Sequence, residues 1–570
     1  MRVIASNPHC FEPVLQNIFQ CFILRKIEEN QMTITKKKEK SGNLKSPEFP
    51  HYASYLKLKT FAKKPFDLTK KDHLTPERIA HFSAESAGYR LLYGTERITD
   101  EVMETLADLA QESNALEKMQ QMQAGAILNT IKNYPSENRA VLHTATRDFF
   151  DAPNPSKEAV AAAEKAKKEV DKLKKFIKQL DHENKFTTLV TIGIGGSDLG
   201  PRAHYMALRH LERKGRKVRF ISNIDPDDAV MAMKGLDLTK TLVVVVSKTG
   251  TTLETQANEK FVREFFKKEG IPSEKHFVSV TSESSPMDDK KRYLESFYIW
   301  DWIGGRYSTT SMVGGVMLSF AFGFEVYWDF LRGAHAMDKA ALNKDIADNI
   351  PLLGALLSVW NRSFLHYPTL ALIPYSQALL RYPAHIQQVE MESNGKHIDQ
   401  NGNQVSDATG PIIWGEPGTN AQHSFYQLIH QGTDIIPLEF IGYQESQCGQ
   451  DSKWEGTTLQ QKLLSNLIAQ AIAFATGQKS TNPNQQFQGN RPSHMLLAKQ
   501  LTPFSLGALL AYFEHKVAFE GFVWGINSFD QEGVQLGKVL AKKVIERFAV
   551  PEKNKEYPLG DAFIQQLKAF

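Results

Sequence analysis

Residues 242–246 form a continuous run of apolar, mostly β-branched side chains. Its length and composition are typical of a strand that is buried on both faces of a parallel sheet. The run ends at the loop Ser247-Lys248-Thr249-Gly250-Thr251-Thr252, and residues 253–270 then have the pattern of an amphipathic helix that ends at a glycine. This order of strand, loop and helix predicts an α/β fold.

The loop at 247–252 has the composition of an anion site. It carries four hydroxyls and a lysine, with no carboxylate before Glu254. A loop between a strand and a helix also presents backbone N–H groups and the positive end of the helix dipole, so we expect it to bind a phosphate. The alternative is that Thr251 or Thr252 caps the helix and Lys248 is a solvated surface charge. The loop does not match the Walker pattern.

Length and charge exclude several classes of protein. A chain of 570 residues predicts at least two domains. The 68 basic and 64 acidic residues give a net charge of +4, too small to indicate a nucleic-acid or anionic-membrane partner. No apolar run approaches the ~20 residues of a membrane helix. Three cysteines cannot form a disulfide framework, which predicts a cytoplasmic protein.

The N-terminal residues 1–48 predict a poorly ordered extension, and an over-long translation start is one explanation of it. Secretion is disfavoured because Gln20 interrupts the apolar stretch and no small-residue cleavage site follows. A mitochondrial presequence is the alternative, but Glu12, Glu28 and Glu29 argue against it.

The rest of the chain divides into segments of different pattern. Residues 49–150 predict a mainly helical region that packs on the second domain, with one helix beginning at Thr99. Ser156 is expected to cap a long helix that reaches Leu180. Alternating strands and helices then predict a doubly wound parallel sheet in one domain, at 151–325, and a second α/β domain at 326–550. The expected strands besides 242–246 are residues 186–194, 218–223, 276–281, 369–374 and 434–441. Helices are expected at 313–330, 352–364, 421–430, 459–475, 505–524 and 531–548, the last forming a C-terminal arm before a tail at 551–570.

A glycine-rich turn, Gly193-Ile-Gly195-Gly196-Ser197, follows the first expected strand. It resembles the dinucleotide fingerprint, but Asp198 stands where the third glycine belongs and would repel a pyrophosphate. Glycine here lets the backbone approach a small ligand, so the turn predicts a second wall of the anion pocket.

Two further segments carry candidate charged groups. Gly304-Gly305-Arg306 can press a guanidinium against a substrate, although a structural ion pair explains it equally well. Glu390 and Glu392 lie where a helix is expected to end, a position that disfavours acidic residues, so one of them is a candidate for proton transfer. A solvated surface is the alternative.

The remaining candidates lie further along the chain. His423 lies near an expected helix start, and zinc binding by His423 and His430 is disfavoured because no third ligand is near in sequence. Gln531 and Lys538 are seven residues apart and share a helix face, where Gly537 would permit close packing. Either could be ordinary surface.

Taken together in this order, these segments resemble the phosphoglucose isomerase family, a family of sugar isomerase (SIS-type) proteins, from about residue 80 to about 550. The blocks that carry the resemblance are Glu137-Asn-Arg-Ala-Val-Leu-His143, Ile192-Gly-Ile-Gly-Gly-Ser-Asp-Leu-Gly200, Ser247-Lys-Thr-Gly-Thr-Thr252, Gly304-Gly-Arg-Tyr-Ser308, Met391-Glu-Ser-Asn-Gly-Lys396, Gly418-Thr-Asn-Ala-Gln-His423 and Phe529-Asp-Gln-Glu-Gly-Val534 with Lys538.

The resemblance implies reversible isomerisation of glucose 6-phosphate to fructose 6-phosphate, through ring opening and a cis-enediol, without metal or cofactor. Glu392 would be the base, Arg306 would stabilise the enediolate, and His423 with Lys538 would open the sugar ring. The substrate and its phosphate would be held by Gly196, Ser197, Ser247, Lys248, Thr249, Thr252, Gln388 and Gln531. Glu390 departs from the family pattern and would add a charge near the base.

The resemblance further implies two αβα sandwich domains of the SIS type, each with a doubly wound parallel sheet, and a homodimer in which His423 comes from the partner subunit. Two alternatives to a dedicated isomerase stay open. One is a non-catalytic sugar-phosphate sensor, which would not need Glu392, Arg306, His423 and Lys538. The other is additional activity on mannose 6-phosphate.

Overall fold

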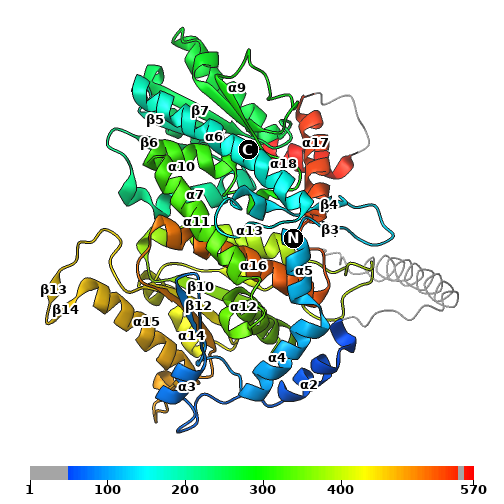
Figure 1. Cartoon of the computed structure of the whole chain (residues 1–570), viewed down its shortest axis with the longest axis vertical. Helices are drawn as coiled ribbons and strands as arrows, with labels where there is room; N and C mark the ends of the chain where they lie inside the picture. Colours follow the sequence, from blue (N-terminus) through cyan, green and yellow to red (C-terminus); the bar gives the residue numbers. More distant parts are fainter. Residues whose placement is uncertain (1–48, 550–556, 570) are drawn as a thin grey trace, which may run out of the picture. The chain divides into compact units, whose positions relative to one another are not determined.

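The computed structural model describes residues 49–549 and 557–569, so the extension predicted at 1–48 lies outside the described residues. A parallel sheet and a second, mainly parallel sheet confirm the predicted α/β class. Figure 1 shows the β5–β9 sheet and the strands β10 and β12 in different halves of the described chain, with α11 and α16 between them.

The first sheet has five parallel strands in the order β6-β5-β7-β8-β9. This is a doubly wound order. The direction in which successive strands are added to the sheet reverses between β5 and β7, and ligands bind at such a point in open sheets. Its strands are β5 (Thr188–Ile192), β6 (Lys217–Ile221), β7 (Thr241–Val246), β8 (Phe277–Thr281) and β9 (Glu295–Tyr298), and its helices are α6 (Lys157–Glu183), α7 (Leu199–Ala207), α8 (Pro226–Met233) and α9 (Leu253–Lys268).

The central strand β7 is buried along its whole length, as predicted. Val243 and Val245 pack in one apolar core, whereas Leu242, Val244 and Val246 pack in another, because side chains alternate along a strand. Both faces of β7 are therefore covered.

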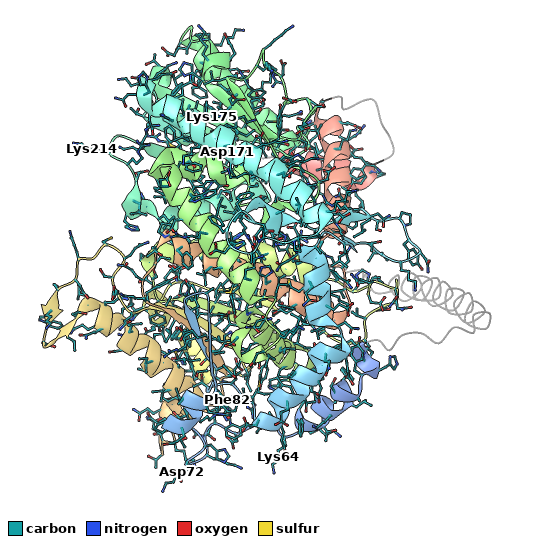
Figure 2. All side chains as sticks on the ribbon, in the orientation of Figure 1. Lys64, Asp72, Phe82, Asp171, Lys175 and Lys214 are labelled. Carbon is teal, nitrogen blue, oxygen red and sulfur yellow. The ribbon has the colours of Figure 1, made fainter. Side chains whose placement is uncertain are left out.

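Helix α6 begins where the sequence predicted. Ser156 is its N-cap, and its hydroxyl accepts a hydrogen bond from the Ala159 N–H. Asp171 and Lys175, labelled on α6 in Figure 2, lie on its exposed side.

The second sheet has six strands in the order β1-β2-β15-β12-β10-β11. The strands β15, β12, β10 and β11 are parallel, and an antiparallel hairpin, β1-β2, extends the sheet at one edge. This hairpin belongs to the region predicted to be mainly helical, and its partner strand β15 lies about 400 residues later, so no local pattern announced the pairing. The strands are β1 (Ser83–Ser86), β2 (Tyr89–Leu92), β10 (Thr369–Pro374), β11 (Ile412–Trp414), β12 (Leu438–Tyr443) and β15 (Ser493–Ala498).

Helix α16 (Pro503–Trp524) is buried on almost all sides and packs against α11 (Phe324–Ala340), α12 (Ile350–Val359) and α13 (Tyr382–Asn394). The single helix predicted at 313–330 is wrong: α10 (Met312–Phe322) ends before α11 begins. The break falls at Gly323, whose φ of 99° interrupts a helix.

The C-terminal arm consists of α17 (Gln535–Ala549) and, within the predicted tail, α18 (Pro558–Lys568). Arg547 and Asp561 pair between the two helices. The remaining elements are α2 (Ala53–Phe61), α3 (Pro76–His81), α4 (Asp100–Glu112), α5 (Ala115–Gln123), β3 (Ile127–Asn129), β4 (Arg139–Ala140), α14 (Tyr426–Gln431), β13 (Lys453–Trp454), β14 (Thr457–Thr458) and α15 (Leu459–Thr476), with short 3₁₀ turns between elements and a π-helical turn at Trp360–Phe364. Over the described ranges, no helix is both long and apolar enough to cross a membrane.

The crossing of α11 and α16 depends on two reciprocal glycines. A Cβ at Gly333 would overlap the Phe504 carbonyl, and a Cβ at Gly507 would overlap the Phe330 carbonyl.

We predict that Gly507→Ala lowers the free energy of unfolding by roughly 1–3 kcal/mol, because the helices must separate. Denaturant unfolding measures this. Gly533→Ala is the control, since its Cβ would have no neighbour within 4 Å; equal stability of both variants would contradict the prediction.

Candidate active site

The loop at 247–252, here called the anion loop, lies at the carboxyl end of β7. The Ser247 and Thr252 hydroxyls are 2.9 Å apart, and the Thr249 and Thr251 hydroxyls are also 2.9 Å apart. Thr252 occupies the N-cap position of α9, yet its side chain makes no cap hydrogen bond. The hydroxyls are therefore gathered within the loop rather than used to cap α9, an arrangement suited to an anion at the start of the helix.

Lys248 connects this loop to the next functional segment. Its Nζ donates a hydrogen bond to the Ile303 carbonyl oxygen at 3.1 Å, just before Gly304. Burial lowers the pKa of Lys248 to about 8, and the nearby Arg139 guanidinium adds to the shift. The ammonium is therefore half-buried rather than a solvated surface charge.

The glycine turn (residues 193–197) packs against the arginine loop (residues 304–308). A Cβ at Gly196 would overlap the Gly305 carbonyl group, so glycine is required for this close approach. Gln388 lies beside the same turn, because a Cβ at Gly195 would be 3.4 Å from its Nε2. The Gln388 Oε1 atom is buried and has no hydrogen-bond partner among the described residues, so it can accept a bond from a ligand.

Arg306 is 1% exposed, and each nitrogen of its guanidinium has an oxygen partner. Its Nε donates to Ser393 Oγ at 2.6 Å, and its Nη1 donates to Gln531 Oε1 at 3.2 Å. Its Nη2 donates to the carbonyl oxygens of Ser528 at 2.6 Å and Asp530 at 3.0 Å. The guanidinium therefore joins three segments that are far apart in the sequence.

Glu392 completes this group. One of its carboxylate oxygens lies 3.4 Å from Arg306 Nη1, and its side chain keeps 22% of its surface exposed. A carboxylate that is partly open and held beside a fixed cation can exchange a proton with a ligand.

Glu390, two residues earlier on α13, has a different environment. It is 1% exposed, and its Oε1 accepts a hydrogen bond from Asn394. Burial, and then the neighbouring Glu520 carboxylate, raise the pKa of Glu390 well above its usual range. Burial therefore disfavours the charge that Glu390 was expected to add near Glu392.

His423 and Lys538 do not join this group within the described chain. Both are exposed, and neither side chain has a hydrogen bond or ion pair with another described residue. His423 lies in a 3₁₀ turn, Asn420–His423, and Lys538 lies on α17. The close packing expected at Gly537 is likewise absent among the described residues, since its Cβ would have no neighbour within 4 Å.

The assembled site can bind an anion at one end and stabilise a developing negative charge at the other. The anion loop and the Arg306–Glu392 pair are linked through Lys248 and the arginine loop. Within the part of the chain that the structure describes, no three His, Cys, Asp or Glu side chains are grouped to hold a metal ion.

Comparison with known proteins identifies the family. The family model described as phosphoglucose isomerase matches residues 92–559. This chain belongs to the phosphoglucose isomerase family. The match covers the first sheet, the parallel strands of the second sheet and every segment of the site described above.

Relatives within the phosphoglucose isomerase family match along most of their length. A glucose-6-phosphate isomerase of Protochlamydia amoebophila is 59% identical over 526 residues, which cover 92% of this chain and 98% of that relative. One from Desulfotalea psychrophila is 50% identical over 523 residues, covering 90% and 97%. The crystal structure of a glucose-6-phosphate isomerase from Chlamydia trachomatis superposes with a TM-score of 0.89 at 48% identity, covering 92% of this chain and all of that one.

Sequence reasoning missed several side chains that surround Arg306. Ser393 and Tyr307 are buried, and their hydroxyls are 2.7 Å apart. His143 stacks on the Tyr307 ring at 4.8 Å. All three lie inside the blocks that resemble the family, and Tyr307 and Ser393 directly follow Arg306 and Glu392 in the sequence, which was the available signal.

The lowered pKa of Lys248 predicts a pH-dependent affinity for anions. Below pH 8 the ammonium is charged and attracts a phosphate, and above pH 8 it becomes neutral. We predict that the inhibition constant of glycerol 3-phosphate, a dianion throughout this range, rises roughly tenfold from about pH 7.5 to about pH 9.5. Lys248→Arg, which stays charged, should remove the rise. An equal rise in that variant would assign the dependence to another group.

Proposed function

We propose that this site of a phosphoglucose isomerase family member interconverts glucose 6-phosphate and fructose 6-phosphate through a cis-enediol. The observation that carries the proposal is the buried Arg306 guanidinium, 3.4 Å from the partly exposed Glu392 carboxylate and linked to an anion loop. The names of the relatives support the same reaction.

The Glu392 carboxylate takes the proton from C2 of the open-chain aldose. The electron pair of that C–H bond forms the C1=C2 double bond, and the negative charge moves to O1, where the Arg306 guanidinium stabilises it. The protonated Glu392 then returns its proton to C1, while the O2 proton passes to O1, so that O2 becomes the ketone oxygen and C1 carries the hydroxyl group. The Glu392 carboxylate carries the proton between C2 and C1.

The protein binds the substrate through its phosphate group. Ser247, Thr249, Thr252 and Lys248 bind it from the anion loop, and Gly196 with Ser197 contact it from the glycine turn. This binding energy, remote from C1 and C2, holds the reacting carbons at Glu392. The unpaired Gln388 oxygen and the Gln531 amide orient the hydroxyls of the sugar.

Ring opening is assigned to His423 and Lys538, and it requires a homodimer. His423 is exposed within its own chain, so we place it in the active site of the partner subunit, with Lys538 near the same ring oxygen. The exposed apolar side chains of α17, among them Leu536 and Val539 at 69% and 55%, support a surface that a second subunit covers. The exposed, unpaired Cys448 fits the cytoplasmic location expected from the cysteine count.

We predict that Glu392→Gln lowers kcat by at least about 10³-fold, because the variant has no base for the C2 proton. The wild type should exchange the C2 proton of glucose 6-phosphate with D₂O, and NMR should detect no exchange in the variant. Its inhibition constant for glycerol 3-phosphate should stay within about twofold of the wild type, since the anion loop is unchanged. Normal C2 exchange in Glu392→Gln would refute the assigned base.

Subunit mixing tests the origin of His423. A heterodimer of one Glu392→Gln subunit and one His423→Asn subunit, purified through two different tags, should have one intact site and about half of the wild-type activity. Each homodimeric variant should be nearly inactive.

The matched control is a heterodimer of Glu392→Gln with Arg306→Ala. Glu392 and Arg306 come from the same chain, so each of its two sites keeps one lesion and the heterodimer should remain inactive. Activity in the control, or none in the test heterodimer, would contradict a shared site.

A further inference from the structure

We propose that the ion pair between Lys396 and Asp530 is a positioning element that fixes Glu392 relative to Arg306 and Gln531. The pair joins the end of α13, which carries Glu392, to the Asp530 loop (residues 527–531), which carries Gln531. The inference rests on the role proposed above for Glu392.

The Lys396 ammonium lies among four oxygen atoms. It donates to the main-chain carbonyls of Glu392 at 3.1 Å and Ser393 at 2.9 Å. These carbonyls have no donor within the helix because α13 ends there. It also contacts the carbonyl oxygen of Asp530 at 3.2 Å and its carboxylate at 3.1 Å. One cation therefore holds the backbone of the proposed base against the neighbouring loop.

Asp530 uses both carboxylate oxygens for protein contacts. Oδ1 faces Lys396, and Oδ2 accepts a hydrogen bond from Asn527 Nδ2 at 2.8 Å. The same Asn527 amide also donates to Asn129 Oδ1 at 3.0 Å. Asp530 is 8% exposed, so its carboxylate has little freedom to contact a substrate, and its effect is on position.

The same loop is held at two further points. Arg306 donates to the carbonyls of Ser528 and Asp530, and the Ser528 hydroxyl donates to Asn394 Oδ1 at 2.7 Å. Lys396 and Arg306 thus share the Asp530 carbonyl, although they reach it from different segments. A shift of this loop would move the Arg306 guanidinium and the Gln531 amide away from Glu392 together.

Charge makes the pair interdependent. Burial lowers the pKa of Lys396, while the Asp530 carboxylate opposes that shift. Removing the ammonium would leave the Asp530 carboxylate nearly buried without its cation, which favours a rearrangement of the loop. Because an error of about 1 Å in the site can lower a rate about 100-fold, the effect should appear in the chemical step.

The test compares Lys396→Met, Lys396→Arg, Asp530→Asn and the double variant Lys396→Met/Asp530→Asn. We expect Lys396→Met to lower kcat by about 10–100-fold, with the inhibition constant of glycerol 3-phosphate within about twofold of the wild type. Lys396→Arg should recover most of the loss, because a cation is restored. The double variant should lose no more than the worse single variant, as expected for two partners in one interaction.

Asp530→Asn tests the same contact with almost unchanged shape. Its amide can accept a hydrogen bond on one side only, so an NH₂ group must face either Lys396 or Asn527, both donors.

The control is Lys167→Met, which breaks an exposed ion pair between Lys167 and Asp171 on α6. Asp171 is labelled in Figure 2. This control should keep full activity.

The outcomes separate the two proposals. Inactive wild type, or normal exchange in Glu392→Gln, would refute the proposed function. The positioning role alone would be refuted if the wild type were active and both Asp530→Asn and a folded Lys396→Met kept kcat within twofold of the wild-type value. The positioning role would also fail if phosphate affinity and kcat fell in parallel, or if Lys396→Arg were as impaired as Lys396→Met.

Discussion

The buried guanidinium of Arg306 is the interaction on which the rest of the site depends. Its five N–H groups face oxygen atoms from Ser393, Gln531, Ser528, Asp530 and Glu392. A charge this deeply buried is stable only when it is paired and hydrogen-bonded, so the segments that supply those oxygens must meet around it. The two sheets and the helices between them serve to bring together an arginine loop, the end of one helix and a loop near residue 530.

Behind the site, the second half of the chain contains a buried network of charges. Although burial opposes it, the Glu439 and Glu96 carboxylates raise the pKa of His494 to about 9, so the imidazole is a cation near neutral pH. Lys516 pairs with Glu520 and Glu439 beside it. Glu390 adjoins this network through Asn394, whose amide donates to both Glu390 and Glu520. Helix α13 therefore presents one glutamate to a closed set of paired charges and another, Glu392, to the open site.

Local patterns were sufficient for much of the fold and for one end of the site. About ten residues of sequence are enough to recognise each of three features: the β-branched run of β7, the hydroxyl-rich loop after it and the Ser156 cap. The β1-β2 hairpin cannot be recognised in this way, because its partner β15 is remote. The break at Gly323 cannot either, since large apolar side chains lie on both sides of this glycine in the sequence. The local pattern alone did not separate Glu390 from Glu392, because the face of α13 that is buried depends on α16, and only the family resemblance assigned the base to Glu392. Ser393 and Lys396 were visible as residues, but their contacts with Arg306 and Asp530 come from tertiary structure alone.

The pairing of β2 with β15 has a consequence for synthesis. Tyr89–Leu92 aligns with residues 495–498, so the hairpin emerges from the ribosome about 400 residues before the strand that completes its sheet. At about 5–20 residues per second, this interval is about 20–80 s. Throughout it the hairpin has an unpaired strand edge, which is a site for association with other chains. The nascent protein therefore depends on the N-terminal helices, or on a chaperone, to shield that edge until the last third of the chain has been made.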